Sequence, residues 1–325
     1  MMYTLVLAVI LAMTAVLGLP QAAAAEPAVE LISAGRVDDA IRVLRGRIQQ
    51  SPNDAEAYHL LARAYFSLQR WDSAIEEGQK AIALDPNNAR YHLWLGRAYG
   101  EKADDASWVN AMGFAKKARA EFERAVQLNG SSVEARTDLA EFYAEAPGFL
   151  GGGKDKAAAQ ADAVRKLGDE ATAHWIAGRI AESAKDYTAA EQHLKAAIAA
   201  SNGNPGFILN LASFYRRRGR VEDVQRTVEN AVQAATRAQN THVLYDAAET
   251  LYRAGRNFSG AAQLLRTYIA AASHAEDAPV FRAHYLLGAL LEKMGDKAAA
   301  ADQYRAALTL ASNFEPAVSA LKRLR

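Results

Sequence analysis

A set of small and aromatic residues returns along the chain about every 34 residues. Within these units, apolar residues recur at three- and four-residue spacing, which is typical of amphipathic helices, and no alternating run indicates a strand. The clearest unit, residues 55–88, carries Tyr58, Leu61, Ala62, Tyr65, Ala74, Ala81 and Pro86. A repeat of this period restricts the chain to stacked helix pairs, because each pair buries its apolar face only against its neighbours.

About eight such units can be counted, and the outer ones are imperfect. They include residues 55–88, 171–204, 205–238 and 281–314, with less regular units around Gly35, Ala89, Val133 and Ala248. This pattern resembles the tetratricopeptide repeat family. The resemblance implies an all-α, right-handed α-solenoid of about eight helix-turn-helix units, with the first helices on its inner wall. We expect one domain over residues 26–325, which ends in a capping helix from Phe314 to Arg325.

The first 25 residues carry no charged side chain and are typical of a secretory signal peptide. The apolar run from Leu5 to Leu19 is shorter than the roughly 20 residues of a membrane-spanning helix, and small residues precede Glu26. We therefore predict cleavage after residue 25 and a periplasmic location in a bacterial cell envelope. An uncleaved anchor is the alternative, because the segment lacks the usual Lys or Arg near its start.

Composition and motifs favour a protein without catalytic activity. The formal net charge is +1, which gives no overall field to attract nucleic acid or an anionic membrane, and the chain has no cysteine. His92, His174 and His284 share one position of their units and lack partners at metal-ligand spacing, so we interpret them as packing residues. We expect no cofactor, no metal and no catalytic residue.

One stretch, APGFLGGGKDKA at residues 146–157, nearly matches the phosphate-binding loop G-x-x-x-x-G-K-[ST]. Its Gly153 and Lys154 are followed by Asp155 where that loop needs a hydroxyl. Helical patterns precede and follow it, whereas a phosphate loop needs a strand before it. We interpret the stretch as an enlarged turn between two helices.

Two insertions, near residues 102–117 and 147–154, fall between the two helices of neighbouring units and place Trp108 and Phe149 on the same edge. Loops of this kind are more often functional than short turns are. The alternative function is therefore that of a non-catalytic subunit of an envelope enzyme or assembly complex, which would dock through these insertions. The other interpretation is that the insertions pack on each other.

The resemblance also implies which side chains face the concave groove. The family positions correspond here to His59, Arg63, Phe66, Arg90, Arg97, Trp175, Arg179, Tyr245 and Tyr252, and, in the unit that starts at Val133, to Glu134, Glu141 and Glu145. A row formed by Arg63, Arg97 and Arg179 predicts a protein or peptide partner with acidic and apolar residues. Alternatively, Glu141 pairs with Arg97 and Arg179 and leaves a neutral wall. We expect a non-enzymatic interaction scaffold that binds its partner in this groove.

Overall fold

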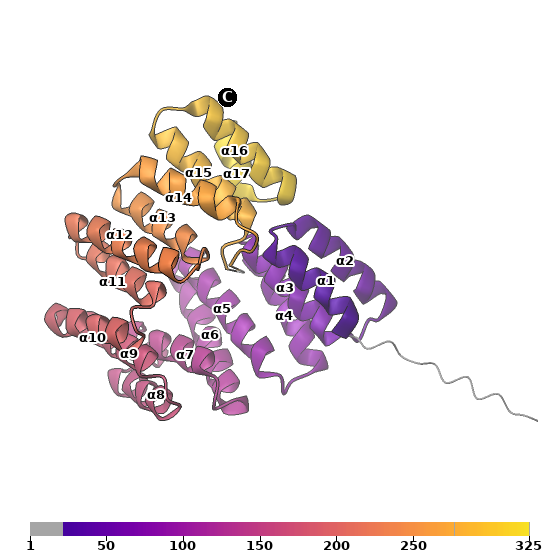
Figure 1. Cartoon of the computed structure of the whole chain (residues 1–325). Coiled ribbons are helices and arrows are strands. Elements are labelled where there is room, and N and C mark those ends of the chain that lie inside the picture. The colour runs from indigo at the N-terminus through magenta and orange to yellow at the C-terminus, as the bar shows by residue number, and fades with distance from the viewer. Residues whose placement is uncertain (1–21, 276, 325) are drawn as a thin grey trace, which may run out of the picture.

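The computed structural model describes residues 22–275 and 277–324, and these ranges contain α-helices, one short 3-10 helix and no strand. Figure 1 shows the helices following one another around a curved stack. The helices are α1 (Ala22–Ser33), α2 (Val37–Gln50), α3 (Ala55–Ser67), α4 (Trp71–Leu84), α5 (Ala89–Asp105), α6 (Trp108–Leu128), α7 (Val133–Glu145), η1 (Gly148–Leu150), α8 (Lys154–Lys166), α9 (Glu170–Ser183), α10 (Tyr187–Ala200), α11 (Pro205–Arg217), α12 (Val221–Arg237), α13 (Val243–Ala254), α14 (Phe258–Ile269), α15 (Val280–Lys293), α16 (Lys297–Leu310) and α17 (Glu315–Arg323).

The helices form eight successive pairs, from α1 with α2 to α15 with α16, followed by α17. The predicted all-α solenoid of about eight helix-turn-helix units with a closing helix is thereby confirmed. Short polar residues fix where the helices start. The Asp54 carboxylate, for example, accepts the Ala57 backbone N–H at 3.0 Å and also pairs with Arg47 at 2.6 Å.

Small residues let the two helices of a unit approach closely. A Cβ atom added to Gly96 of α5 would lie 2.6 Å from Cε1 of Phe122 on α6. The corresponding atom on Gly288 of α15 would lie 2.6 Å from Cε1 of Tyr304 on α16. Both rings are buried, so neither can move aside without opening the core.

Replacing Gly96 with alanine is expected to lower the free energy of unfolding by about 1–3 kcal/mol, because the new methyl group overpacks the contact with Phe122. Gly113→Ala in α6 is the matched control, since nothing lies within 4 Å of its added Cβ. Alanine there should raise stability by about 0.5–1 kcal/mol through its better helix propensity. Urea-induced unfolding measures the free energy of unfolding of both variants. Equal stability of the two variants would contradict the close-packing explanation.

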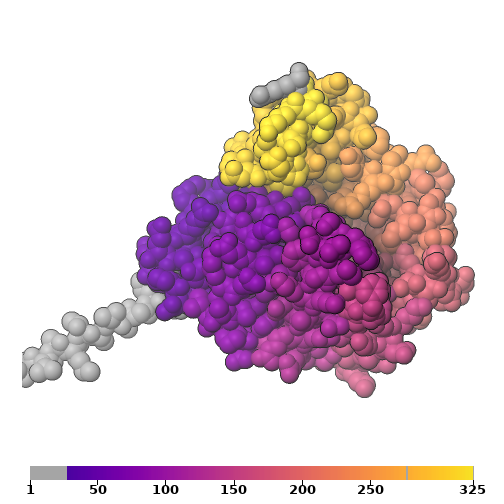
Figure 2. Space-filling model, turned by 180° about the vertical axis from the view of Figure 1, so that it is seen from behind, coloured from indigo at the N-terminus to yellow at the C-terminus, as the bar shows by residue number. Residues whose placement is uncertain are grey.

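The two ends of the solenoid touch, so the stack closes on itself. A Cβ added to Gly35, in the turn between α1 and α2, would lie 2.8 Å from the backbone nitrogen of Val280. The Asp38 Oδ2 atom accepts the Ser312 backbone N–H at 2.7 Å. One hydrophobic cluster joins Ile32 of the first unit with Phe314 before α17. Figures 1 and 2 show the yellow C-terminal helices lying against the indigo N-terminal ones.

The predicted signal peptide lies almost entirely outside the described residues. The predicted cleavage site before Glu26 falls within α1, so cleavage there would remove the first residues of this helix. Export therefore stays a prediction. Among the described residues, no helix combines the length and the apolar character that a membrane crossing requires.

Candidate functional site

A groove of about 660 Å³ lies along the first helices α3, α5 and α7. Its apolar side chains include the rings of Phe66, Trp94 and Phe142. One guanidinium group, that of Arg97, also lines it. The carboxylates around it belong to Glu101, Asp104, Glu134, Asp138, Glu141, Glu145 and Asp277. The groove thus combines an aromatic surface with an excess of acidic groups.

The Trp94 side chain of α5 contacts side chains of both α3 and α5 on the wall of the groove. The Cζ atoms of Arg63 and Arg97 lie 4.9 and 5.0 Å from the centre of its ring, within cation–π range. The Phe66 ring meets it edge-on at 5.4 Å. These contacts hold the two arginine side chains against the wall.

Two arginines of the predicted row, Arg97 and Arg179, form ion pairs with carboxylates of neighbouring helices. Arg97 pairs with Asp138 at 2.6 Å and with Glu134 at 2.7 Å, both on α7. Arg179 of α9 pairs with Glu141 at 3.2 Å and also with Glu145. The structure therefore differs from a basic row open to a partner. The alternative pairing of Glu141 with Arg179 is present, whereas Arg97 pairs with other carboxylates.

Several groove carboxyl groups ionise less readily than free ones do. Partial burial raises the pKa of Asp138 and of Glu141, although each lies beside an arginine. Burial and then the neighbouring Asp104 raise the pKa of Glu101. Glu101, Asp104 and Asp277 make no ion pair with any residue in ranges 22–275 and 277–324. Bringing a cation into the groove would relieve this repulsion.

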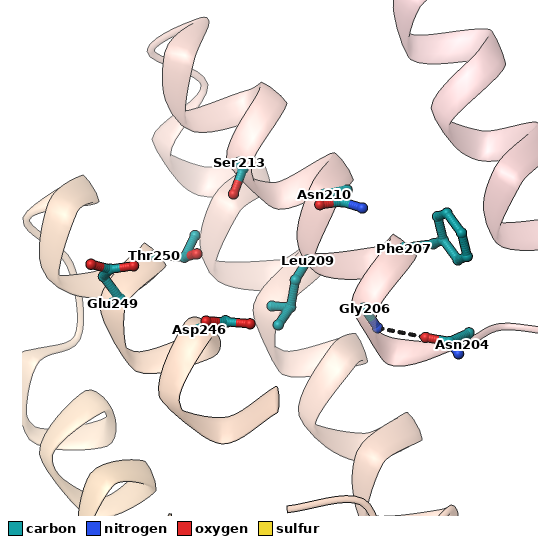
Figure 3. A pocket seen from close by; sticks show the side chains of 9 residues that line it. All are labelled: Asn204, Gly206, Phe207, Leu209, Asn210, Ser213, Asp246, Glu249 and Thr250. Carbon is teal, nitrogen blue, oxygen red and sulfur yellow. Dashed lines mark hydrogen bonds between the residues drawn. The ribbon is translucent and has the colours of Figure 1, made fainter. Parts of the chain in front are cut away.

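A second hollow of about 380 Å³ lies between α11 and α13 and also has an acidic side. Figure 3 shows Asp246 and Glu249 of α13 beside the α11 side chains Leu209 and Ser213. Desolvation, then the charges of Asp277 and Glu249, raise the pKa of Asp246 to about 7. Asp277 thus lines the groove and also acts on Asp246, so the two hollows share one electrostatic environment.

Most other predicted concave residues support the wall without lining the groove. His59 is 1% exposed, its ring centre lies 4.7 Å from that of Tyr91, and burial lowers its pKa. Tyr245 is buried, and Arg90 pairs with Glu56 at 2.9 Å. Trp175 and Tyr252 are partly buried against core clusters. Of the predicted concave side chains, Phe66, Arg97, Glu134, Glu141 and Glu145 line the groove.

Sequence reasoning missed Trp94 and Asp138 as groove residues. Each stands at the sixth position of its unit, next to the fifth position that the family resemblance assigned to the groove. Trp94 offered a usable signal, because tryptophan is enriched at interfaces, whereas Asp138 offered none, because carboxylates are depleted there. Leu93, at the fifth position, is buried in the core instead.

The first predicted insertion, residues 102–117, differs from a loop: α5 runs to Asp105 and α6 starts at Trp108, so the extra residues lengthen the two helices. Both predicted insertions expose large apolar side chains. Trp108 is 74% exposed, Val109 69% and Phe149 68%. The insertions are connected, because α6 contacts η1 and the Arg119 guanidinium donates to the Leu150 carbonyl oxygen at 3.0 Å. Trp108 and Phe149 therefore contribute little to the core, and a docking role for them stays a prediction.

The glycine-rich stretch is a turn between helices. It joins α7 to α8 through η1, and its amides serve the turn itself: Gly152 donates to the Pro147 carbonyl at 3.2 Å and Gly153 to that of Tyr143 at 2.8 Å. Amides bonded in this way cannot also cradle a phosphate. The enlarged-turn interpretation agrees with this geometry.

The histidines hold positions in the helix packing. His92 contacts a Glu121 carboxylate oxygen through Nδ1 at 2.6 Å, and His284 contacts Gln303 at 2.8 Å. The His174 ring lies 5.8 Å from that of His193. Within the described ranges, no three potential metal-ligating side chains come together.

Solved structures similar to this chain are repeat proteins. Yeast Tom70 matches with a TM-score of 0.53 at 15% identity, over 89% of this chain and 58% of that one. TTC0263, a thermophilic TPR protein of Thermus thermophilus, matches with a TM-score of 0.49 at 21% identity, over 59% of this chain and 97% of that one. These likenesses concern the fold. Comparison with curated protein sequences gives no match.

Family models described as tetratricopeptide repeat match residues 31–98 and 181–240, residues 151–205, and residues 281–314. Together these segments cover more than half of the chain, and the last of them coincides with the pair α15 and α16. The chain belongs to the tetratricopeptide repeat family.

Proposed function

We propose that this chain is a non-catalytic scaffold whose concave groove binds a cationic segment of a protein partner that also carries apolar side chains. The observation that carries the proposal is the lining of the groove, where seven carboxylates and one guanidinium surround the aromatic rings of Phe66, Trp94, Phe122 and Phe142. The repeats and their stacking support an interaction scaffold in general. The charge of the groove determines which partner segment fits.

This partner differs in charge from the acidic segment that the arginine row led us to expect. Arg97 and Arg179 already bind carboxylates of the wall, so an acidic peptide would have to displace those partners. A lysine or arginine side chain would instead meet Glu101, Asp104 and Asp277, which make no ion pair with a described residue. Trp94 and Phe142 offer apolar contact beside these charges.

The proposed setting is the bacterial cell envelope, after export by the N-terminal segment. The support for it is the uncharged, apolar sequence of residues 1–25. Mass spectrometry of the protein purified from its source cells tests it. A mature chain that starts at Glu26 is the expected result, whereas a full-length chain in the membrane fraction would favour the uncleaved anchor.

Fluorescence anisotropy with short labelled peptides tests the groove. A peptide that alternates Arg with Leu should bind more tightly than one that alternates Glu with Leu, and its affinity should fall as salt is added. A peptide that alternates Arg with Ser separates the apolar contribution from the charge. Tighter binding of the Glu–Leu peptide would contradict a cationic partner segment and would favour the acidic segment expected from the sequence.

Affinity for the Arg–Leu peptide is expected to fall as the pH is lowered from 8 to 6. The pKa of Asp246 is raised to about 7, so its carboxyl group is mostly charged at pH 8 and mostly neutral at pH 6. Asp246 lines the neighbouring hollow, where the charge of Asp277 raises its pKa and that of Arg282 lowers it. A cation bound beside Asp277 would favour the charged form of Asp246, so protonation of Asp246 opposes binding. The expected loss is about two- to fivefold, and Asp246→Asn should reduce it. A rise in affinity on acidification would contradict this account.

A second candidate surface is the edge formed by the insertions, because Trp108 and Phe149 expose most of their rings. A partner that docks there would let the chain act as a non-catalytic subunit of an envelope assembly. Trp108→Ser with Phe149→Ser should abolish binding at the edge without changing the affinity of the groove for the Arg–Leu peptide. The two candidate surfaces are thus separable.

A further inference from the structure

A third hollow, of about 620 Å³, lies where the first unit meets the C-terminal end of the chain. Its lining comes from α2, from the end of α3 with the turn after it, and from the turn between α16 and α17. It shares no residue with the groove or with the hollow between α11 and α13. The hollow exists because the two ends of the solenoid meet. Ser312 and Asn313, near the C-terminus, form one side, and Arg45 and Arg70, near the N-terminus, form the other.

Arg45 and Arg70 converge on Tyr65 within this hollow. The Arg45 Nη2 atom donates to the Tyr65 hydroxyl oxygen at 2.6 Å, and the Arg70 Cζ atom lies 4.9 Å from the centre of the Tyr65 ring. Tyr65 itself is 3% exposed, so its position is set by the core. The hydroxyl oxygen accepts from Arg45, which leaves the hydroxyl proton to be donated.

The guanidinium groups of Arg45 and Arg70 differ from those of the neighbouring arginines in and before α2. Arg36 and Arg42 both bind the Asp39 carboxylate, and Arg47 binds Asp54. In contrast, Arg45 and Arg70 form no ion pair with any residue of the described ranges, and Arg70 donates to the neutral Ser73 hydroxyl, 3.3 Å away. The hollow therefore has two cationic groups whose charge no carboxylate of those ranges offsets by direct contact.

The acidic residue that lines this hollow is engaged elsewhere. Asp38 uses its Oδ2 atom to accept the Ser312 backbone N–H at 2.7 Å, across the contact between the chain ends. Its neighbour in sequence, Asp39, lies between Arg36 and Arg42. The charge of the hollow is thus positive, and its donors lie on both sides of the closure.

We propose that this hollow binds an anionic oxygen group, a carboxylate or a phosphate, through Arg45, Arg70 and the Tyr65 hydroxyl. The planar guanidinium fork suits paired hydrogen bonds to such oxygens. A ligand seated there also contacts the Ser312–Asn313 turn, so its binding energy stabilises the contact between the two ends of the solenoid. The site is independent of the cationic segment proposed for the groove.

Calorimetric titration with inorganic phosphate, at an ionic strength held constant with sodium chloride, tests the site. The unaltered chain should bind phosphate and unfold at a higher temperature when it is present. Arg45→Gln with Arg70→Gln should weaken binding at least about tenfold, since two charge-assisted contacts are lost. Each single variant should give part of this loss, which keeps the test valid if the double variant does not fold.

The matched control is Arg226→Gln with Arg305→Gln, which removes two exposed arginines from α12 and α16. Phosphate binding should survive in this control. Acetate and a short peptide with a free C-terminal carboxylate form the second arm, and preference for either over phosphate would assign the site to a carboxylate. Equal affinity of the double variant and the control for every probe, or no saturable binding by the unaltered chain, would overturn the proposal.

Discussion

Replacing Phe314 with alanine is expected to destabilise the protein by about 3–5 kcal/mol, because a fully buried aromatic ring is lost from the contact between the two ends of the solenoid. Phe314 is 1% exposed, and its ring lies 5.0 Å from that of Phe281 and 5.4 Å from that of Tyr285. It belongs to the same hydrophobic cluster as Ala28 and Ile32 of the first unit. The change should therefore loosen helices at both ends of the sequence.

Amide hydrogen exchange distinguishes a closed from an open solenoid. In an open stack, each unit contacts only its neighbours, and a C-terminal change would accelerate exchange in α15–α17 alone. In the closed arrangement, Phe314→Ala should also accelerate exchange in α1 and α2. Phe214→Ala, in α11, is the control, since this ring is equally buried at 1% exposure but lies in the other large cluster. Unchanged exchange in α1 and α2 of the Phe314 variant would show that the ends contribute no stability to each other.

Neutralising the three groove carboxylates without an ion pair should abolish most of the affinity for the Arg–Leu peptide. The variant is Glu101→Gln, Asp104→Asn and Asp277→Asn. Each lost attraction is worth about 0.5–1 kcal/mol, so affinity should fall about 10- to 100-fold. The free energy of unfolding should change little, because no arginine loses its carboxylate partner.

A control with the same change in net charge separates the groove from a general electrostatic effect. It replaces the outward carboxylates Asp162, Glu222 and Asp302, whose side chains are 65%, 83% and 71% exposed. The control should retain affinity within about twofold, since exposed charges far from the ligand are screened by salt. Equal losses in the two triple variants would mean that the peptide responds to net charge alone.

The repeat period made the helix pairs predictable, and the position of small residues such as Gly96 made their close packing predictable too. Both depend on contacts within a unit or between neighbouring units, which recur at fixed sequence offsets. The groove was predictable only in part for the same reason. Phe66 and Arg97 follow the repeat, and Trp94 stands one position away from the residue that the repeat rule selected.

The charge of the groove depends on contacts that the repeat does not encode. Arg97 was visible in the sequence, but its partners Glu134 and Asp138 follow from the rotation of α7 against α5. Asp277 enters the groove from the loop before α15, which the closed solenoid brings beside α5 and α7. Spacing placed Glu134, Glu141 and Glu145 on the wall, but no local pattern relates residue 277 to residue 97, so the full acidic excess could not be derived from spacing.

Photo-crosslinking in the source cells tests the central claim most directly. A photoreactive amino acid replaces Phe142 in the groove, and separately Phe149 on the exposed edge. We expect the photoreactive residue at position 142 to crosslink to a partner segment rich in Lys or Arg. The three neutralising substitutions in the groove should abolish this crosslinked product. Capture from position 149 alone, or an acidic segment captured at position 142, would contradict it.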